Sequence, residues 1–117
     1  MGARKIIFDA LAAAGIPAAE DHFRADALGA KGTHAVVRHE GTSTLFSGGR
    51  PRAVVDEWSV TLYSPERDEE AEKALIGALG RADLPIGGSS SGYDDEHLVH
   101  WREWDFQTIG ELEWHDN

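Results

Sequence analysis

Cysteine is absent from this 117-residue chain, and its absence excludes disulfide bonds and thiolate metal sites. Long apolar runs are also missing, since none approaches the roughly 20 residues that a membrane-spanning helix needs. The first residues are basic and then apolar, as in a signal peptide, but Asp9 interrupts the apolar stretch. The sequence therefore predicts neither a membrane span nor a secreted, disulfide-linked domain.

Basic residues are scarce. The chain has 11 Lys and Arg against 21 Asp and Glu, which gives a formal net charge of −10. A surface of this sign repels a phosphate backbone, so we expect no sequence-independent binding of nucleic acid. Two interpretations of the charge stay open: it keeps the protein soluble, or it lets DNA pass a conduit without adhering to the wall.

The remaining composition is that of an ordinary globular protein, with 41% hydrophobic and 27% charged residues. A chain of this length has the usual size of one domain. Neither a long linker nor an internal repeat divides it. We therefore predict one domain over residues 1–117, with its core at about 3–108 and a C-terminal tail at about 109–117.

Two segments have the apolar spacing of helices. The first runs from Ala3 to Ala14, with Gly15 as a left-handed cap and Pro17 preventing continuation. The second runs from Asp68 to Leu79, has an acidic first turn that suits the helix dipole, and has Gly80 as its expected cap. Their apolar stripes consist of Ile7, Ala10, Leu11 and Ala14 in the first, and of Ala71, Ala74, Leu75, Ala78 and Leu79 in the second.

Most of the other segments have the patterns of strands. Residues 34–39 and 42–47 form two candidates, and Gly48-Gly49 then suits a tight hairpin turn. Pro51 delays full pairing of the next strand to about Ala53, from where it runs to Tyr63. Residues 18–32 are harder to place, although 21–24 could form a short strand.

The second half of the chain adds a flexible loop and a last strand. Residues 87–92 are all Gly or Ser, which is typical of a flexible segment. Residues 97–108 form the last strand, but its large side chains shift from odd to even positions. A bulge near Arg102-Glu103, or burial on both faces in an assembly, would explain the shift. Together these elements predict an α+β fold: an antiparallel or mixed sheet of four to five strands with two helices on one face.

Few residues are arranged for chemistry. His34 and His39 lie five apart in a strand, so they point to opposite faces and cannot readily share a metal. His97 and His100 have the same spacing problem. The Gly/Ser segment 87–92 lacks the Lys of a phosphate loop, and a nucleophile elbow and a dinucleotide fingerprint are absent. Acidic pairs are numerous enough to arise by chance. We therefore expect no catalytic residue, no cofactor and no metal.

One aromatic group is the main candidate for a binding surface. It consists of Trp58, Trp101, Trp104 and Phe106. Such a group either fills the core or anchors a subunit interface, where Trp is enriched. A 117-residue domain with four Trp and two Ala-rich helix faces has apolar surface to spare. These features favour a subunit interface as the alternative to the core.

The order of several short motifs resembles that of the tail terminator (tail-completion) proteins of long-tailed bacteriophages. The resemblance covers about residues 6–106. It consists of Ala14-Gly15-Ile16-Pro17 after the first helix, Phe46 before Gly48-Gly49, a strand ending Leu62-Tyr63, the acidic helix start at 68–71, and a terminal strand. The Gly/Ser segment 87–92 and the Trp-rich last strand depart from the family pattern.

The resemblance implies a virion structural protein of the tail-neck region, present in the host cytoplasm during assembly. Such a protein forms a hexameric ring at the head-proximal end of the tail tube, stops tube polymerisation and offers a docking surface to the head-tail connector. Its partners would be its own copies, the tube protein below and a connector or stopper above, with viral DNA passing through unbound and no membrane involved.

Acidic residues could then line the pore of the ring. The candidates are Asp94, Asp95 and Glu96, followed by Glu111, Glu113 and the helix face with Glu69, Glu70 and Glu72; alternatively, these acids face solvent outside the ring. Two other functions stay open. One is another head-tail connector component, such as a stopper or a tube-like protein. The other is a small acidic ligand-binding or enzymatic domain.

Overall fold

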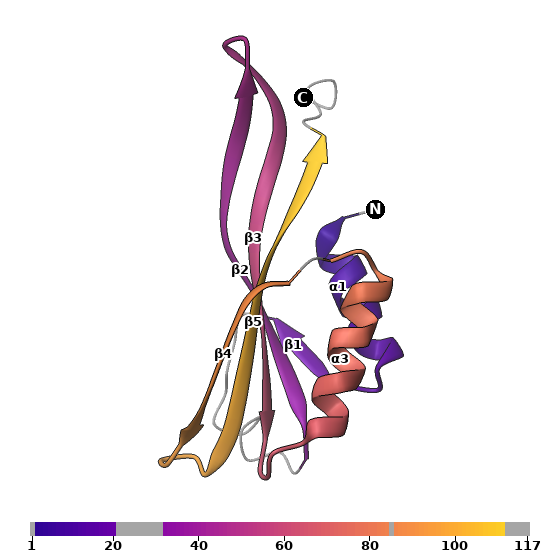
Figure 1. Cartoon of the computed structure of the whole chain (residues 1–117), viewed down its shortest axis with the longest axis vertical. Helices are drawn as coiled ribbons and strands as arrows, with labels where there is room; N and C mark the ends of the chain where they lie inside the picture. The colour runs from indigo at the N-terminus through magenta and orange to yellow at the C-terminus, as the bar shows by residue number, and fades with distance from the viewer. Residues whose placement is uncertain (1, 21–31, 85, 112–117) are drawn as a thin grey trace.

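The computed structural model describes residues 2–20, 32–84 and 86–111. Its elements are α1 (Ala3–Ala13), β1 (Ala18–Glu20), β2 (His34–Ser47), β3 (Arg50–Ser64), α3 (Glu69–Arg81), β4 (Ile86–Asp94) and β5 (Val99–Glu111). The strands form one mixed sheet in the order β1-β2-β3-β5-β4. In it, β1 and β2 are parallel, while the β2–β3, β3–β5 and β4–β5 pairs are antiparallel. Both helices lie side by side on one face of the sheet (Figure 1). The predicted α+β class is confirmed.

The core lies between the helices and the sheet. Ile7 and Leu11 of α1 and Leu75 and Leu79 of α3 are at most 1% exposed, as their predicted apolar stripes require. They meet helix-facing side chains of three strands, namely Val37, Trp58, Val60, Leu62, Trp104 and Phe106. Full burial of one such aliphatic side chain stabilises a fold by about 1.5–3 kcal/mol. This layer therefore holds the helices on the sheet.

Each helix is followed by a residue in the left-handed conformation, which is a glycine after α1 and an aspartate after α3. Gly15 has φ 75° after α1, and the amide of Ile16 donates to the carbonyl of Leu11 at 3.0 Å, so the predicted cap is confirmed. The prediction for the second helix is wrong, because α3 continues through Gly80 to Arg81. There Asp83 takes the left-handed conformation with φ 59°. Aspartate tolerates this conformation better than most side chains do, so glycine is not required.

The first turn of α3 is fixed by Asp68. Its carboxylate accepts the backbone N–H of Ala71 at 3.0 Å and the hydroxyl of Thr33 at 2.8 Å. Asp68 is therefore the N-cap, one residue before the helix proper. These two hydrogen bonds, led by that from Ala71, lower the pKa of Asp68 below its ordinary value.

The strands β2 and β3 form one long hairpin. The sequence pattern was interpreted as two strands over 34–39 and 42–47, but β2 is continuous, with a bulge at Glu40 between its pairs His39–Trp58 and Gly41–Glu57. A bulge bends a strand without ending it, so the polar Glu40-Gly41 step did not stop pairing. Gly48 and Gly49 have φ 61° and 76°, as the predicted tight turn needs.

The last two strands correct two further predictions. Residues 87–92, expected to be a flexible loop, belong to the edge strand β4, because β5 supplies backbone partners from Val99 to Phe106. The predicted bulge near Arg102-Glu103 is wrong, since the β3–β5 register runs unbroken from Ser64–His100 to Ala53–Glu111. The large side chains change parity because β5 is covered on different faces along its length: Val99, 3% exposed, is buried on the far face of the sheet, whereas Trp104, 2% exposed, is buried against the helices.

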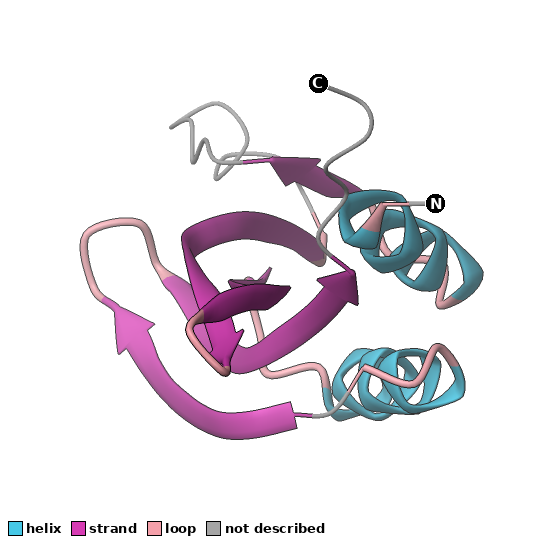
Figure 2. Ribbon diagram, turned by 90° about the horizontal axis from the view of Figure 1, so that it is seen from above, coloured by secondary structure: helices cyan, strands magenta, loops and turns pink. Residues whose placement is uncertain are grey.

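Strand and helix lengths do not match. The 15 residues of β3 span about 50 Å, whereas the 13 residues of α3 span about 20 Å. The helices therefore cover less than half of the long hairpin. Its far end projects beyond them and gives the molecule extents of 50 × 27 × 24 Å (Figure 1). Viewed along this long axis, the sheet curls and both helices stay on one side (Figure 2).

Candidate functional site

Three of the four aromatic candidates belong to the core of a single chain. Trp58, Trp104 and Phe106 are 4%, 2% and 3% exposed and pack against the helices. Trp58 also donates its indole N–H to the hydroxyl of Thr108 at 3.0 Å. A side chain buried in its own chain has no surface left for a second one. The core alternative therefore holds for these three, which corrects the interface expectation for them.

Trp101 lies on the opposite face of the sheet and is only half-buried. It pairs with Gly92 of β4, and a Cβ at that glycine would lie 2.7 Å from the indole ring. Gly92 thus leaves the space in which the indole lies across the edge strand. Trp101 is the one aromatic candidate whose surface a neighbouring subunit could still use.

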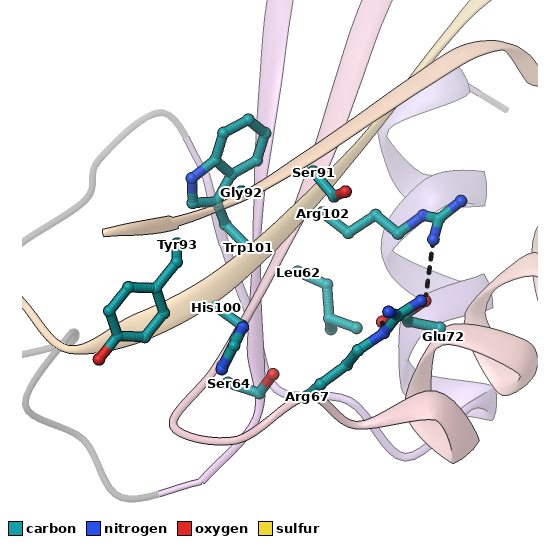
Figure 3. A pocket seen from close by; sticks show the side chains of 10 residues that line it. All are labelled: Leu62, Ser64, Arg67, Glu72, Ser91, Gly92, Tyr93, His100, Trp101 and Arg102. Atoms are coloured by element: carbon teal, nitrogen blue, oxygen red, sulfur yellow. Dashed lines mark hydrogen bonds and ion pairs between the residues drawn. The ribbon is translucent and has the colours of Figure 1, made fainter. Parts of the chain in front are cut away.

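Trp101 also borders a cavity of about 290 Å³ beside the β3–α3 connection, shown in Figure 3. Leu62, Ser64, Arg67, Glu72, Ser91, Gly92, Tyr93, His100, Trp101 and Arg102 line it. Two guanidinium groups share one carboxylate there: Arg102 Nη1 lies 3.3 Å and Arg67 Nε 3.7 Å from the oxygens of Glu72. Arg102 also lies over the ring of Trp104, with 5.6 Å between its central carbon and the ring centroid.

These contacts give the cavity a structural role. Glu72 belongs to α3 and Arg102 to β5, so their ion pair ties the helix to the sheet. The hydroxyls of Ser64 and Ser91 line the cavity with His100, but neither is hydrogen-bonded to that ring within the described part of the chain. The ring of His100 instead contacts Tyr93, with 4.8 Å between centroids. The arrangement lacks the nucleophile and base contact that covalent catalysis requires.

The first three predicted pore residues lie where β4 turns into β5: Asp94 is the last residue of β4, and Asp95 and Glu96 follow it. Asp94 holds this turn together: it accepts the backbone N–H of Glu96 at 3.0 Å and that of His97 at 3.1 Å, and it pairs with the His97 ring at 2.9 Å. The hydrogen bonds to His97 lower the pKa of Asp94. Asp95 and Glu96 are exposed. Whether this acidic turn faces a pore stays a prediction; Glu113 lies outside the described residues.

The histidines are separated as their spacing predicted. His34 stacks on Tyr63 at 5.6 Å, whereas His39 pairs with Asp56 at 2.8 Å at the base of the projecting hairpin. Asp56 also accepts the hydroxyl of Thr42 at 2.7 Å. Burial alone would raise the pKa of Asp56, but the hydrogen bonds from Thr42 and His39 lower it. No group of three or more metal-binding side chains occurs among the described residues.

The far face of the sheet holds one carboxyl group with a raised pKa. Burial is the main cause at Glu103, and the nearby charge of Asp105 adds to it. The hydroxyl of Thr61 donates to Glu103 at 3.2 Å across the β3–β5 pair.

The most distinctive surface is the far part of the β2–β3 hairpin, residues 41–55, here called the arm. Residues 42–50 are all exposed. At its tip Leu45 is 46% and Phe46 is 67% exposed, and beside it on β5 Ile109 is 68% exposed. Sequence reasoning missed this surface, because alternation alone does not show where the helices stop covering a strand. The excess of strand length over helix length was the signal that could have found it.

Neither described helix has the length and apolar character of a membrane span. No protein-family model matches the sequence, and no curated protein matches it significantly. The function of the chain is therefore inferred from its geometry. It offers an uncovered arm, a half-buried Trp101 and an acidic turn, and structural ion pairs of Glu72 lie at the cavity beside α3.

Proposed function

We propose that this protein is a structural subunit of the bacteriophage tail neck, of the tail terminator type, and that it acts without catalysis. Six copies would form a ring on the head-proximal end of the tail tube. That ring would end tube polymerisation and present the docking surface for the head-tail connector. In this proposal DNA passes through the ring without specific binding.

The uncovered arm is the observation that carries the proposal. A monomeric protein gains nothing by extending two strands beyond its core, whereas an assembly protein needs surfaces that a neighbour can cover. The arm carries exposed Leu45 and Phe46 and lies apart from the helices (Figure 1). The motif order that resembles tail terminators supports the same class, because the described elements occur in that order along the chain.

The direct test has two parts. First, the mass and shape of the purified protein are measured by size-exclusion chromatography with light scattering and by negative-stain electron microscopy. We expect rings of six 12.8-kDa chains, either free or on tube ends. Second, the tube protein of the same genome is polymerised with and without this protein. We expect shorter tubes with a ring at one end.

The outcomes separate the competing functions. Rings that leave tube length unchanged but bind the connector would indicate a stopper, and co-polymerisation along the whole tube would indicate a tube subunit. A monomer that ignores tube ends and binds a small molecule beside Glu72 would contradict the assembly role. It would favour the ligand-binding alternative instead.

A further inference from the structure

The arm is held to the rest of the chain only at its base. The strand β5 pairs with β3 as far as Ala53, where Glu111 is its partner. Beyond that point residues 45–52 form a two-stranded ribbon around the Gly48-Gly49 turn. An isolated two-stranded hairpin is marginally stable in water. A surface that covers the tip would therefore also order it.

The tip presents apolar side chains to solvent. At the tip, Phe46 is 67% and Leu45 is 46% exposed; toward the base of the arm, Ile109 of β5, which pairs with Val55, is 68% exposed. These are three of the seven large hydrophobic side chains that are exposed in the described residues. Aromatic side chains such as Phe46 are enriched in the centres of protein interfaces. The tip thus has the composition of a protein contact.

The charge of the arm is opposite to that of the rest of the molecule. Residues 41–55 contain Arg50 and Arg52 and no Asp or Glu, so the arm carries +2. The other nine Lys and Arg face 21 Asp and Glu, so the rest of the chain carries −12. Both arm arginines are exposed. A second copy of the chain therefore offers the arm a body of opposite net charge.

We infer that the arm of one copy docks on the acidic body of the next copy, with Phe46 as its apolar anchor and Arg50 and Arg52 as its charged contacts. The arm and the body are different surfaces at different ends of one molecule (Figure 1). Their contact is therefore heterologous, the type that closes rings when the rotation fits. This inference deepens the proposed ring and rests on it, since it names the surface that joins the subunits.

Nucleic acid is the other ligand that two arginines could meet. A phosphate backbone that approached Arg50 and Arg52 would also approach the −12 charge of the remaining chain. Phosphate contacts also gain nothing from an exposed phenylalanine at the hairpin tip unless a base stacks on it. The combination of charge and apolar surface therefore favours a protein partner.

The test reverses the charge of the arm and compares it with an equal change elsewhere. Arg50→Glu/Arg52→Glu alters the arm, and Lys5→Glu/Lys73→Glu alters two exposed lysines of the helices by the same net charge. Phe46→Ser is matched with Ile76→Ser, which removes a 41% exposed side chain from α3. Circular dichroism and thermal unfolding first establish that each variant folds.

Assembly is then measured by light scattering from 50 to 500 mM NaCl, free and on tube ends. We expect the arm variants to weaken subunit association at least tenfold, whereas the helix variants, which leave the arm intact and the body at least as acidic, should not weaken it by more than twofold. High salt should weaken the wild-type ring, because its charged contacts are at the surface. After Arg50→Glu/Arg52→Glu this dependence on salt should reverse, because salt then screens the repulsion between the arm and the acidic body.

Other results would overturn the inference or the proposed function separately. If both arm variants form rings and cap tubes as the wild type does, the arm inference is wrong and the function stands. If the wild type associates through the arm but leaves tubes uncapped, the function is wrong and the arm contact stands. Loss of duplex DNA binding in Arg50→Glu/Arg52→Glu, with unchanged assembly, would reassign the arm to nucleic acid. A wild type that stays monomeric, alone and on tubes, overturns both.

Discussion

The body and the arm are built from the same two strands, yet they depend on different interactions. In the body, β3 is covered on both faces: Trp58, Val60 and Leu62 face the helices, while Ser59 and Thr61 are at most 2% exposed on the other side. In the arm, the part of the same strand beyond Ala53 has the Gly48-Gly49 turn and one partner strand. A strand can therefore continue beyond the core of the domain once its register with the neighbouring strand of the hairpin is fixed.

The largest expected difference separates Trp104 from Phe46. Trp104→Ala leaves a cavity between the sheet and the helices and should cost about 3–5 kcal/mol of unfolding free energy. Phe46→Ala removes a side chain that is 67% exposed and should change the stability of the monomer by less than about 0.5 kcal/mol. Urea denaturation of both variants in the monomeric state measures this. Equal losses would show that the arm is part of the cooperative core.

The edge strand offers the next test. Gly92→Ala places a Cβ 2.7 Å from the indole of Trp101, so the ring has to move, at a cost of about 1–3 kcal/mol. Gly88→Ala in the same strand meets no atom within 4 Å and serves as the control. The double variant Gly92→Ala/Trp101→Ala should cost less than the two single changes together. Additive losses would mean that the two residues do not interact.

A cap at the body end should have a smaller effect that depends on pH. Asp68→Ala removes the N-cap of α3 and its bond from Thr33, at a cost of about 0.5–2 kcal/mol at pH 7. The pKa of Asp68 is lowered from the ordinary value of 3.8 in the folded chain. Its contribution is therefore present above that value and is lost as the pH falls through the lower folded-state pKa.

The difference between wild type and Asp68→Ala should accordingly shrink on acidification below about pH 4. Thermal unfolding from pH 7 to pH 2.5 measures it. Glu70→Ala, which also removes an acidic charge near the start of α3, is the control for charge alone. A difference that stays constant over this range would contradict the capping role of the ionised carboxylate.

The smallest effect on global stability should come from the turn of the arm. Gly49 has φ 76°, so Gly49→Ala strains the turn by about 1 kcal/mol. Because the tip lies outside the core, we expect faster amide hydrogen exchange at residues 45–52 and an unchanged thermal midpoint. The same substitution at Gly15 of the body, where φ is 75°, should lower the midpoint. If Gly49→Ala lowers it equally, the arm and the body unfold together.

Local patterns in the sequence determined the α+β class. The helical stripe with Ile7 and Leu11, the cap at Gly15 and the paired glycines at 48–49 each correspond to one backbone geometry, and all three occur as predicted. Such features depend on residues that are close in the chain, so spacing alone identifies them. The alternation of Trp58, Val60 and Leu62 likewise identified the helix-facing side of the longest strand.

Tertiary structure decided the features that depend on distant partners. Residues 87–92 have the composition of a linker, but pairing with β5 makes them a strand, because backbone hydrogen bonds do not depend on side-chain type. Asp83 rather than Gly80 takes the left-handed position after α3, since packing of Leu79 and Leu84 carries the helix two residues further, to Arg81. Trp104 lies in the core and Phe46 in solvent because the helices are shorter than the strands they cover. The sequence alone determines both helices and the long strands with alternating side chains, and only the packed layers decide which further segments pair and which faces are left for a partner.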